Sequence, residues 1–313
     1  MKNLRSVVAA DTALLAVTFV WGTTFTVIQD TLDRLTPMAL NAWRFLLAAA
    51  MLGLWQLIDR RHNRLAGGNA LHLLLAGGVL GTILFAGYGC QTVGLLYTPA
   101  SNAAFITGLN VVMVPIFSAL LLKKVPSRSA SLGALTAAIG LFFLTTGGRL
   151  SFNPGDAVVL GCAVAFALHI VVTGKFTEQF ASLPLTIVQL AVVALLSFVI
   201  GGLFDGTRVV PVHTLLRADV AAVILFMSLF ATALAYLLQT VLQKKIPATH
   251  VGVIYVMEPV FAAWTSVLVQ HARLSGMELI GCVLILIGML LAVRPSSAGT
   301  HTTTGISVHR SPK

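Results

Sequence analysis

Ten apolar stretches follow one another along this chain of 313 residues, and they constrain its fold more than any other feature. A helix that crosses a hydrocarbon core of roughly 30 Å needs about 20 mostly apolar residues. We place the stretches at residues 11–29, 37–58, 71–95, 99–122, 129–147, 155–174, 184–204, 219–243, 248–270 and 275–293. The sequence therefore predicts an all-α polytopic membrane protein with ten transmembrane helices.

The basic residues indicate how such a protein is oriented. Lys and Arg number 20 against 10 Asp and Glu, which would suggest a nucleic-acid partner in a soluble chain. Here they lie in short loops between the stretches, where they set membrane topology. With a cytoplasmic N-terminus, fourteen fall on the inner side and five on the outer side. We therefore expect both termini in the cytoplasm, a bacterial-type inner (plasma) membrane and no nucleic-acid partner.

Neither the cysteines nor the C-terminal tail indicates additional chemistry. Cys90, Cys162 and Cys282 lie inside predicted spans, so they form neither a loop disulfide nor a metal-binding spacing. Residues 296–313 are rich in Ser, Thr, Gly and His without apolar periodicity, which predicts a disordered cytoplasmic tail. We expect no metal and no cofactor.

An internal repeat appears when the chain is shifted against itself by 148 residues. Residues 88–140 then align with 236–288 without a gap. The matches include Tyr88 with Tyr236, Gln91 with Gln239, Pro99 with Pro247, Gly133 with Gly281 and Gly140 with Gly288, while Asn110 aligns with Glu258. Membrane segments resemble one another because they use few residue types, but shared Tyr, Gln, Pro and Gly favour a duplicated five-helix unit.

The repeat predicts two units, at residues 1–147 and 148–295. Five is an odd number, so the second unit must enter the membrane from the side opposite the first, which gives inverted repeats. In transporters built this way the substrate binds between the halves near the bilayer midplane, and the site opens to each side in turn. The chain is thus expected to bind a small-molecule substrate within a lipid bilayer, as a monomer or a homodimer.

Several segments resemble the EamA-type permeases of the drug/metabolite transporter superfamily, and the resemblance covers nearly the whole chain. They are Trp21-Gly22-Thr23-Thr24-Phe25, Pro37 with Arg44-Phe45, Thr98-Pro99-Ala100-Ser101-Asn102-Ala103-Ala104-Phe105 and Glu258-Pro259-Val260-Phe261-Ala262-Ala263. The resemblance implies ten helices in two inverted repeats and export of amino acids, other metabolites or toxic compounds. The family often has an acid just after the fourth and ninth spans, where this chain has Lys124 and Ala272.

Glu258 is the leading candidate for substrate binding or proton coupling. It lies about 16 Å into the ninth span, close to the bilayer midplane. A charge at a span centre costs about 2.5–3.5 kcal/mol, so the carboxyl group should face a cavity, find a cation or take up a proton. The alternative is a structural, hydrogen-bonded acid beside the break expected at Pro259.

Arg44 is the second candidate and lies about 10 Å into the second span. Its guanidinium group could bind a substrate carboxylate with two hydrogen bonds. The alternative is a structural pair with Glu258 or with backbone carbonyl groups.

Further candidates are polar or aromatic residues within the spans. Tyr88 and Gln91 are three residues apart, as are Tyr236 and Gln239, so each pair lies on one helix face. The alternative for each is interhelical hydrogen bonding or core packing. The remaining candidates are Trp21, Thr24, Asn102, Asn110 and His169, with Pro115 and Pro259 as helix hinges.

Other classes of function lack their usual signals. The chain has no HExxH pair, no GxSxG elbow and no Walker loop, and its predicted loops are too short for a catalytic domain, so we do not expect an enzyme. No pore loop or ring of selectivity residues indicates a channel. The inverted repeat indicates secondary transport and does not by itself separate export from uptake.

Overall fold

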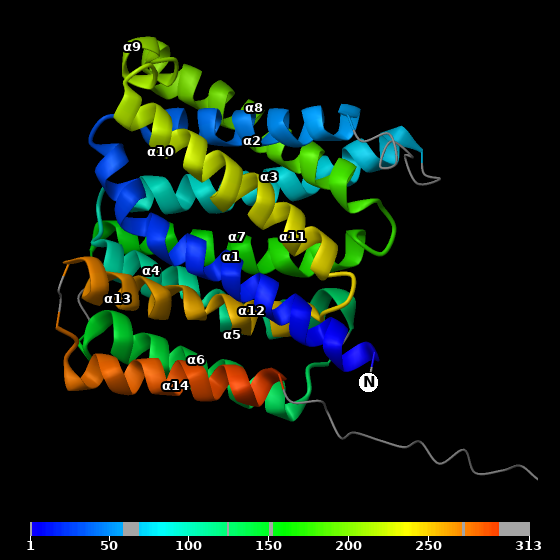
Figure 1. The fold of residues 1–313 in the computed structure, drawn as a ribbon, viewed down its shortest axis with the longest axis vertical. Coiled ribbons are helices and arrows are strands. Elements are labelled where there is room, and N and C mark those ends of the chain that lie inside the picture. The colour runs from blue at the N-terminus through cyan, green and yellow to red at the C-terminus, as the bar shows by residue number, and fades with distance from the viewer. Residues whose placement is uncertain (1, 59–68, 124, 150–152, 271–272, 294–313) are drawn as a thin grey trace, which may run out of the picture.

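The computed structural model describes residues 2–58, 69–123, 125–149, 153–270 and 273–293, and every regular element in these ranges is a helix. The helices lie side by side in one bundle (Figure 1). Their bounds are α1 Lys2–Leu32, α2 Pro37–Ile58, α3 Ala70–Gly94, α4 Ala100–Gly108, α5 Asn110–Leu122, α6 Arg128–Thr146, α7 Pro154–Phe176, α8 Ser182–Phe204, η2 Gly206–Val209, α9 Val212–Leu215, α10 Ala218–Ser228, η3 Leu229–Leu234, α11 Ala235–Leu242, α12 Ala248–Tyr255, α13 Met257–Gln270 and α14 Gly276–Val293.

Seven helical segments are long and apolar enough to cross a membrane, by length and composition. They correspond to seven of the ten predicted spans. The other three predicted spans correspond to α1, with the shorter apolar stretch Val8–Thr24, to α14, with the stretch Gly276–Ala292, and to the pair α12 and α13. The predicted tail at 296–313 and the residues Lys124 and Ala272 lie outside the described residues.

Local sequence signals set the helix ends. At the start of α6 the Ser127 side chain accepts a hydrogen bond from the Ala130 amide, and α6 ends at Gly147, whose φ of 58° favours glycine. At α7 the Asp156 carboxylate accepts a 2.9 Å bond from the Asn153 amide, next to Pro154 in the first helical position. These signals keep the connections between consecutive helices short.

Two of the predicted spans are interrupted by a single residue. The fourth is broken at Leu109, between α4 and α5, and the ninth at Val256, between α12 and α13. Pro259 explains the second break, because its ring excludes a helical bond to the Tyr255 carbonyl, where α12 ends. Pro115, the other predicted hinge, lies inside α5, six residues after the break at Leu109, and remains a prediction.

Helices α6 and α14 cross at their glycines. A Cβ atom added to Gly133 would lie 2.5 Å from the Gly288 carbonyl oxygen, and one added to Gly140 would lie 2.7 Å from the Gly281 oxygen. The reverse approaches, from Gly288 and Gly281, are 2.6 Å each. The two helices are therefore antiparallel and in backbone contact, side by side at one edge of the bundle (Figure 1).

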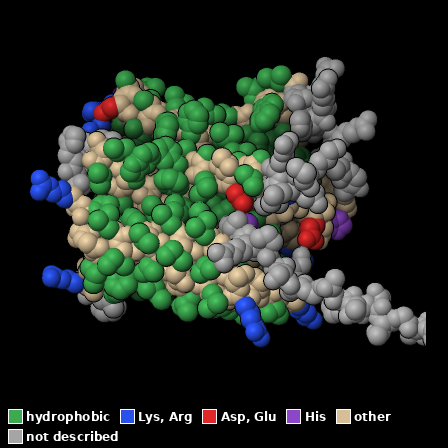
Figure 2. Space-filling model, turned by 60° about the horizontal axis from the view of Figure 1, so that its bottom comes forward, with side chains coloured by type: hydrophobic (Ala, Val, Ile, Leu, Met, Phe, Trp, Pro, Cys, Tyr) green, Lys and Arg blue, Asp and Glu red, His purple; other side chains and the backbone are tan. Residues whose placement is uncertain are grey.

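The surface of the bundle suits a bilayer. On the face shown in Figure 2, hydrophobic side chains cover the broad middle, whereas Lys and Arg side chains lie around the rim. The exposed apolar side chains include Leu132 and Ile139 on α6 and Val283 and Leu290 on α14. Large apolar areas of this kind are stable in lipid and unfavourable in water.

Candidate functional site

A cavity of about 60 Å³ lies in the middle of the bundle. Small-molecule sites usually enclose roughly 300–1,000 Å³, so the cavity would have to widen to hold a drug-sized ligand. The residues that line it are Trp21, Thr24, Ile28, Arg44, Tyr88, Gln91, Thr107, Asn110, Phe166, His169, Ile170, Tyr236, Gln239, Tyr255 and Glu258. Ten of the eleven binding candidates named from the sequence are in this set.

The exception is Asn102, which lies in the first turn of α4 and is not part of the cavity lining. The signal that selected it was the match to a family segment at the start of the fourth span. That segment fixes where the helix begins, whereas the cavity begins one to two turns later, at Thr107 and Asn110.

Most of the lining consists of residues separated by the repeat distance of 148. The pairs are Trp21 with His169, Tyr88 with Tyr236, Gln91 with Gln239, Thr107 with Tyr255 and Asn110 with Glu258. A residue of the first half and its equivalent in the second half therefore face the same space. This arrangement is expected where two copies of one unit meet around a shared axis.

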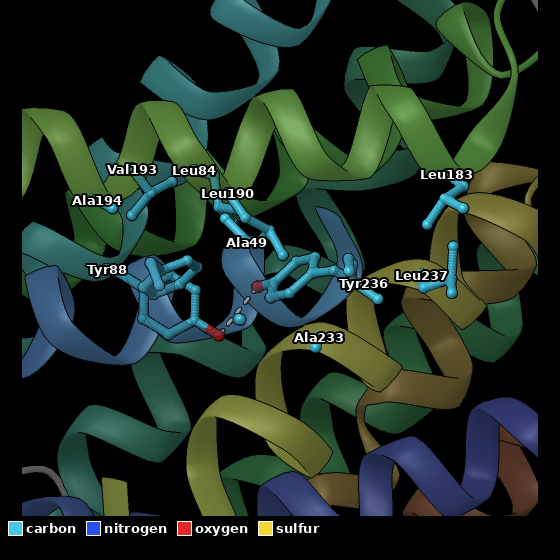
Figure 3. Packing of buried hydrophobic residues seen from close by; sticks show 13 residues of the cluster. Ala49, Leu84, Tyr88, Leu183, Leu190, Val193, Ala194, Ala233, Tyr236 and Leu237 are labelled. Atoms are coloured by element: carbon cyan, nitrogen blue, oxygen red, sulfur yellow. Dashed lines mark hydrogen bonds between the residues drawn. The ribbon is translucent and has the colours of Figure 1, made fainter. Parts of the chain in front are cut away.

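Tyr88 and Tyr236 lie closest to that axis. The Tyr236 hydroxyl donates a hydrogen bond of 2.9 Å to the Tyr88 hydroxyl, so two equivalent residues contact each other directly (Figure 3). Their rings pack against Phe45, Leu84 and Leu190, and both tyrosines are at most 5% exposed. This contact joins α3 to α11 within the lining of the cavity.

Arg44 is held by a π-helical segment of the opposite half. Its Nε donates to the Thr232 hydroxyl at 2.5 Å and its Nη2 to the Ala231 carbonyl at 3.1 Å, both in η3. The Thr232 hydroxyl donates onward to the Met227 carbonyl, five residues back, as a π turn allows. The guanidinium carbon also lies 5.0 Å from the centre of the Tyr88 ring.

This geometry supplies one of the two structural pairings considered for Arg44. No ion pair joins Arg44 to Glu258 within 4.0 Å in the part of the chain that the structure describes. The pairing with a backbone carbonyl is present instead, so two of the three guanidinium nitrogens are already engaged by the protein. The Ala231 carbonyl also accepts the Trp21 indole N–H at 2.8 Å, so one carbonyl oxygen of the buried residue Ala231 binds side chains of both α1 and α2.

Three polar groups of the cavity lining lie near the two helix breaks. The Asn110 Oδ1 atom and the Tyr255 hydroxyl have no hydrogen-bond partner among the described residues, and the Glu258 carboxylate lines the cavity with them. All three lie within three residues of the helix breaks at Leu109 and Val256. A polar ligand in the cavity would find its hydrogen-bonding partners here.

The opposite wall has its polar groups already satisfied. His169 Nε2 lies 2.8 Å from Gln189 Oε1, and the His169 ring meets the Tyr236 ring edge to face at 5.8 Å. Gln239 donates to Gln243 at 3.2 Å, and Gln243 donates to the Ile170 carbonyl. Thr24 bonds to the carbonyl of Trp21 on its own helix. This wall is therefore preformed and largely aromatic.

Sequence reasoning did not select Thr107, Tyr255, Ile28, Phe166 or Ile170. The signal for the first two was present, because Thr107 and Tyr255 are separated by 148 residues and each lies three residues before Asn110 or Glu258. The other three are apolar and carry no sequence signal that distinguishes them from core residues.

The whole chain was compared with known protein families and with relatives. The model of the EamA-like transporter family matches it twice, at residues 8–146 and 153–294. The chain belongs to the EamA-like transporter family. The two matches contain the two sides of the cavity, because each lining pair has one member in each match.

Curated relatives of this EamA-like chain are also transporters. An uncharacterised transporter of Archaeoglobus fulgidus is 32% identical over 286 residues, which cover 90% of this chain and 85% of the relative. The transporter YyaM of Bacillus subtilis is 28% identical and covers 89% of this chain and 92% of its own length. The inner membrane transporter YedA of Escherichia coli is 32% identical over 47% of each chain.

A solved crystal structure has the same fold as this EamA-like chain. It superposes with a TM-score of 0.76 over 93% of this chain and 99% of its own, at 21% sequence identity. The family, the relatives and the apolar helices together identify a multi-pass membrane protein of a transporter family.

Proposed function

We propose that this chain is a secondary-active exporter of a small metabolite, an amino acid or related compound or a drug, which binds in the central cavity. The observation that carries the proposal is the cavity itself. It is built from equivalent residues of the two halves and contains a carboxylate, Glu258, beside aromatic walls. A site shared equally by two repeats is what alternating access requires.

The proposed topology has ten spans in two inverted repeats, with boundaries at residues 1–147 and 148–295. The antiparallel contact of α6 and α14 supports inversion, because Gly133 meets Gly288 while its equivalent Gly281 meets Gly140. Equivalent helices related by an axis along the membrane normal would be parallel. An axis in the membrane plane gives this crossed, antiparallel pattern.

Both termini are proposed to be cytoplasmic, since that orientation gives fourteen basic residues inside against five outside. Fusing alkaline phosphatase or a fluorescent protein after the C-terminal span tests this orientation. Fluorescence without phosphatase activity is the expected result.

Within the cycle, Glu258 is proposed to bind the substrate or a coupling proton. A carboxylate near a span centre is costly unless it is neutralised, so occupation by a cationic group or a proton favours the closed cavity. Arg44, which is held by hydrogen bonds to η3, is proposed to offset the negative charge of Glu258 in the cavity.

The experiment compares solutes released by cells that make equal membrane amounts of the wild-type chain, Glu258→Gln, Arg44→Ala and Glu278→Gln. Glu278 is a matched control, since it is an exposed carboxylate that accepts a bond from the Ser275 amide at the start of α14. We expect a solute in the medium of wild-type and Glu278→Gln cells that Glu258→Gln cells retain.

Two other results would change the proposal. Depletion of a solute from the medium by the wild-type chain would indicate an uptake permease with the same fold. Chemical conversion of an added solute without its transfer across the membrane would indicate a membrane-embedded enzyme. Equal release from all four strains would remove Glu258 and Arg44 from the transport mechanism.

A further inference from the structure

A pair of titratable residues, Asp11 and His250, lies outside the cavity and between the two halves. His250 Nε2 is 3.1 Å from Asp11 Oδ1, and the side chains are 12% and 16% exposed. Both atoms are buried, and neither has a hydrogen-bond partner among the described residues, so the 3.1 Å approach is an ion-pair contact. Asp11 belongs to α1 in the first half and His250 to α12 in the second, at the end of the bundle where the N-terminus lies (Figure 1).

The pair interrupts an otherwise apolar contact between α1 and α12. Ala10 and Leu14 of α1 pack in one cluster with Val251 and Ile254 of α12, and all four are at most 2% exposed. Two ionisable groups in such a contact weaken it unless they bond to each other. Their presence is therefore unexplained by packing.

Helix α1 and the interrupted span formed by α12 and α13 connect this pair to the cavity. Further along α1, Gly22 lies against the Glu258 backbone, where an added Cβ would be 2.5 Å from the carbonyl oxygen. His250 and Glu258 lie on either side of the break at Val256. A movement of α12 about this break would separate His250 from Asp11 while α13 stays packed against α1.

The positions equivalent to Asp11 and His250 do not form a titratable pair, because a shift of 148 residues relates Asp11 to Val159 and His250 to Asn102. Near them, Gly94 at the end of α3 lies against Gly155 at the start of α7, and Thr98, just before α4, donates a hydrogen bond to Asp156. A proton can therefore be bound at one end of the substrate path in a way that the other end does not repeat.

The other charged and titratable groups of the described residues lie elsewhere along the bundle. No described residue other than the partner forms an ion pair with Asp11 or His250. The basic side chains near this end of the bundle are Lys123, Arg128, Lys175, Lys244 and Lys245. The titratable side chains in the cavity are Arg44, Tyr88, His169, Tyr236, Tyr255 and Glu258. Asp30, Asp156, Asp219, Cys282 and Glu278 lie toward the far end.

We propose that Asp11 and His250 form a proton-binding latch that closes this end of the substrate path, and that opening it takes up one proton. The proposal rests on alternating access and goes beyond it by assigning a coupling site outside the cavity. In the closed contact the imidazole is neutral, because the positive N-terminal end of α12 disfavours an imidazolium. In the open state water reaches His250, which takes up a proton from solution below about pH 6.5.

The sign of the pH effect follows from the proton count. The open state binds one more proton than the closed state, so acid favours opening. One proton changes the ratio of open to closed forms by at most about tenfold per pH unit. The effect should be largest below about pH 6.5 and absent well above it.

A ligand-free labelling experiment tests the latch. Ala10→Cys is introduced into full-length protein in which Cys90, Cys162 and Cys282 are replaced by Ala, and its reaction with a maleimide is followed in nanodiscs between pH 5.5 and 8. Each rate is divided by that of Val8→Cys, which is 56% exposed and corrects for thiol ionisation. The normalised rate should rise severalfold as the pH falls.

His250→Gln should remove this rise, whereas His72→Gln should keep it, because His72 is an exposed histidine at the start of α3 at the same end. Asp11→Asn provides a second variant and should give fast labelling at every pH. The latch is excluded by a rise that persists in His250→Gln, or by a reporter that never reacts. The labelling result does not depend on solute release. The latch proposal can therefore be excluded while the export proposal stands, and the export proposal can be excluded while the latch proposal stands.

Discussion

The two interrupted helices of the bundle have the same geometry and different chemistry. Both α4 with α5 and α12 with α13 follow a Pro-Ala pair, break after eight or nine residues and then present a polar side chain to the cavity. The first half presents Asn110 and the second Glu258. The duplicated backbone thus builds equivalent cavity walls, while only the second half presents a carboxylate at this position.

The largest effect is expected from exchanging the two polar residues. Glu258→Asn should lower solute release to about a tenth or less, since losing one charged contact of about 1.4 kcal/mol is a tenfold change. Adding Asn110→Glu should restore part of the release if the carboxylate acts from either side of the axis. The release assay at matched membrane levels measures both variants. No recovery in the double variant would show that the two positions are not interchangeable.

Adding a methyl group at the glycine crossing should destabilise both halves equally. Gly140→Ala and Gly288→Ala each bring a Cβ within 2.7 Å of backbone atoms on the facing helix, so each should cost about 1–3 kcal/mol. Gly78→Ala is the control, because nothing lies within 4 Å of its added Cβ. Thermal unfolding in detergent measures all three. Clearly unequal losses at Gly140 and Gly288 would contradict the symmetric contact.

Removing the Thr232 hydroxyl should affect only one half. Thr232→Val deprives the Arg44 Nε of its acceptor and should cost about 1.5–3 kcal/mol, whereas Thr232→Ser should be close to wild type. The equivalent position in the first half is Leu84, which lies in the continuous helix α3. The measurement is the unfolding temperature of each variant. An equal loss in the Ser variant would assign the effect to packing of the methyl group.

The smallest effect is expected at the tyrosine pair. Tyr88→Phe and Tyr236→Phe remove the same hydrogen bond, so each should cost about 0.5–1.5 kcal/mol. The double variant should cost little more than either single one, because the bond can be lost only once. A double-mutant cycle by thermal unfolding measures this. Additive losses would show that each hydroxyl has a separate partner.

The sequence was sufficient to predict the helical membrane fold, because apolar length is dictated by bilayer thickness. It also predicted the cavity residues well, because a polar group within a span needs a partner and the repeat distance relates such groups in pairs. Glu258, Asn110 and the two Tyr and Gln pairs were found in this way.

The rest depends on geometry that no local pattern encodes. The hydrogen bond between Arg44 and Thr232 of the π-helical segment η3 joins residues that are 188 positions apart in sequence. The break at Leu109 has no proline beside it, unlike the one at Val256, so no local residue type predicts it. Asp11 and His250 carried no motif and became a pair only through the packing of α1 on α12.

The bond between Tyr88 and Tyr236 has a consequence for how such a molecule can change over time. In a dimer of identical five-helix chains, one codon would specify both tyrosines, and any substitution would alter the two sides of the contact together. In a single fused chain each position mutates alone. Because the positions mutate independently, one half can hold Glu258 while the other keeps Asn110. Fusion of the two genes thus allows a symmetric assembly to become asymmetric, and asymmetry is needed for transport in one preferred direction.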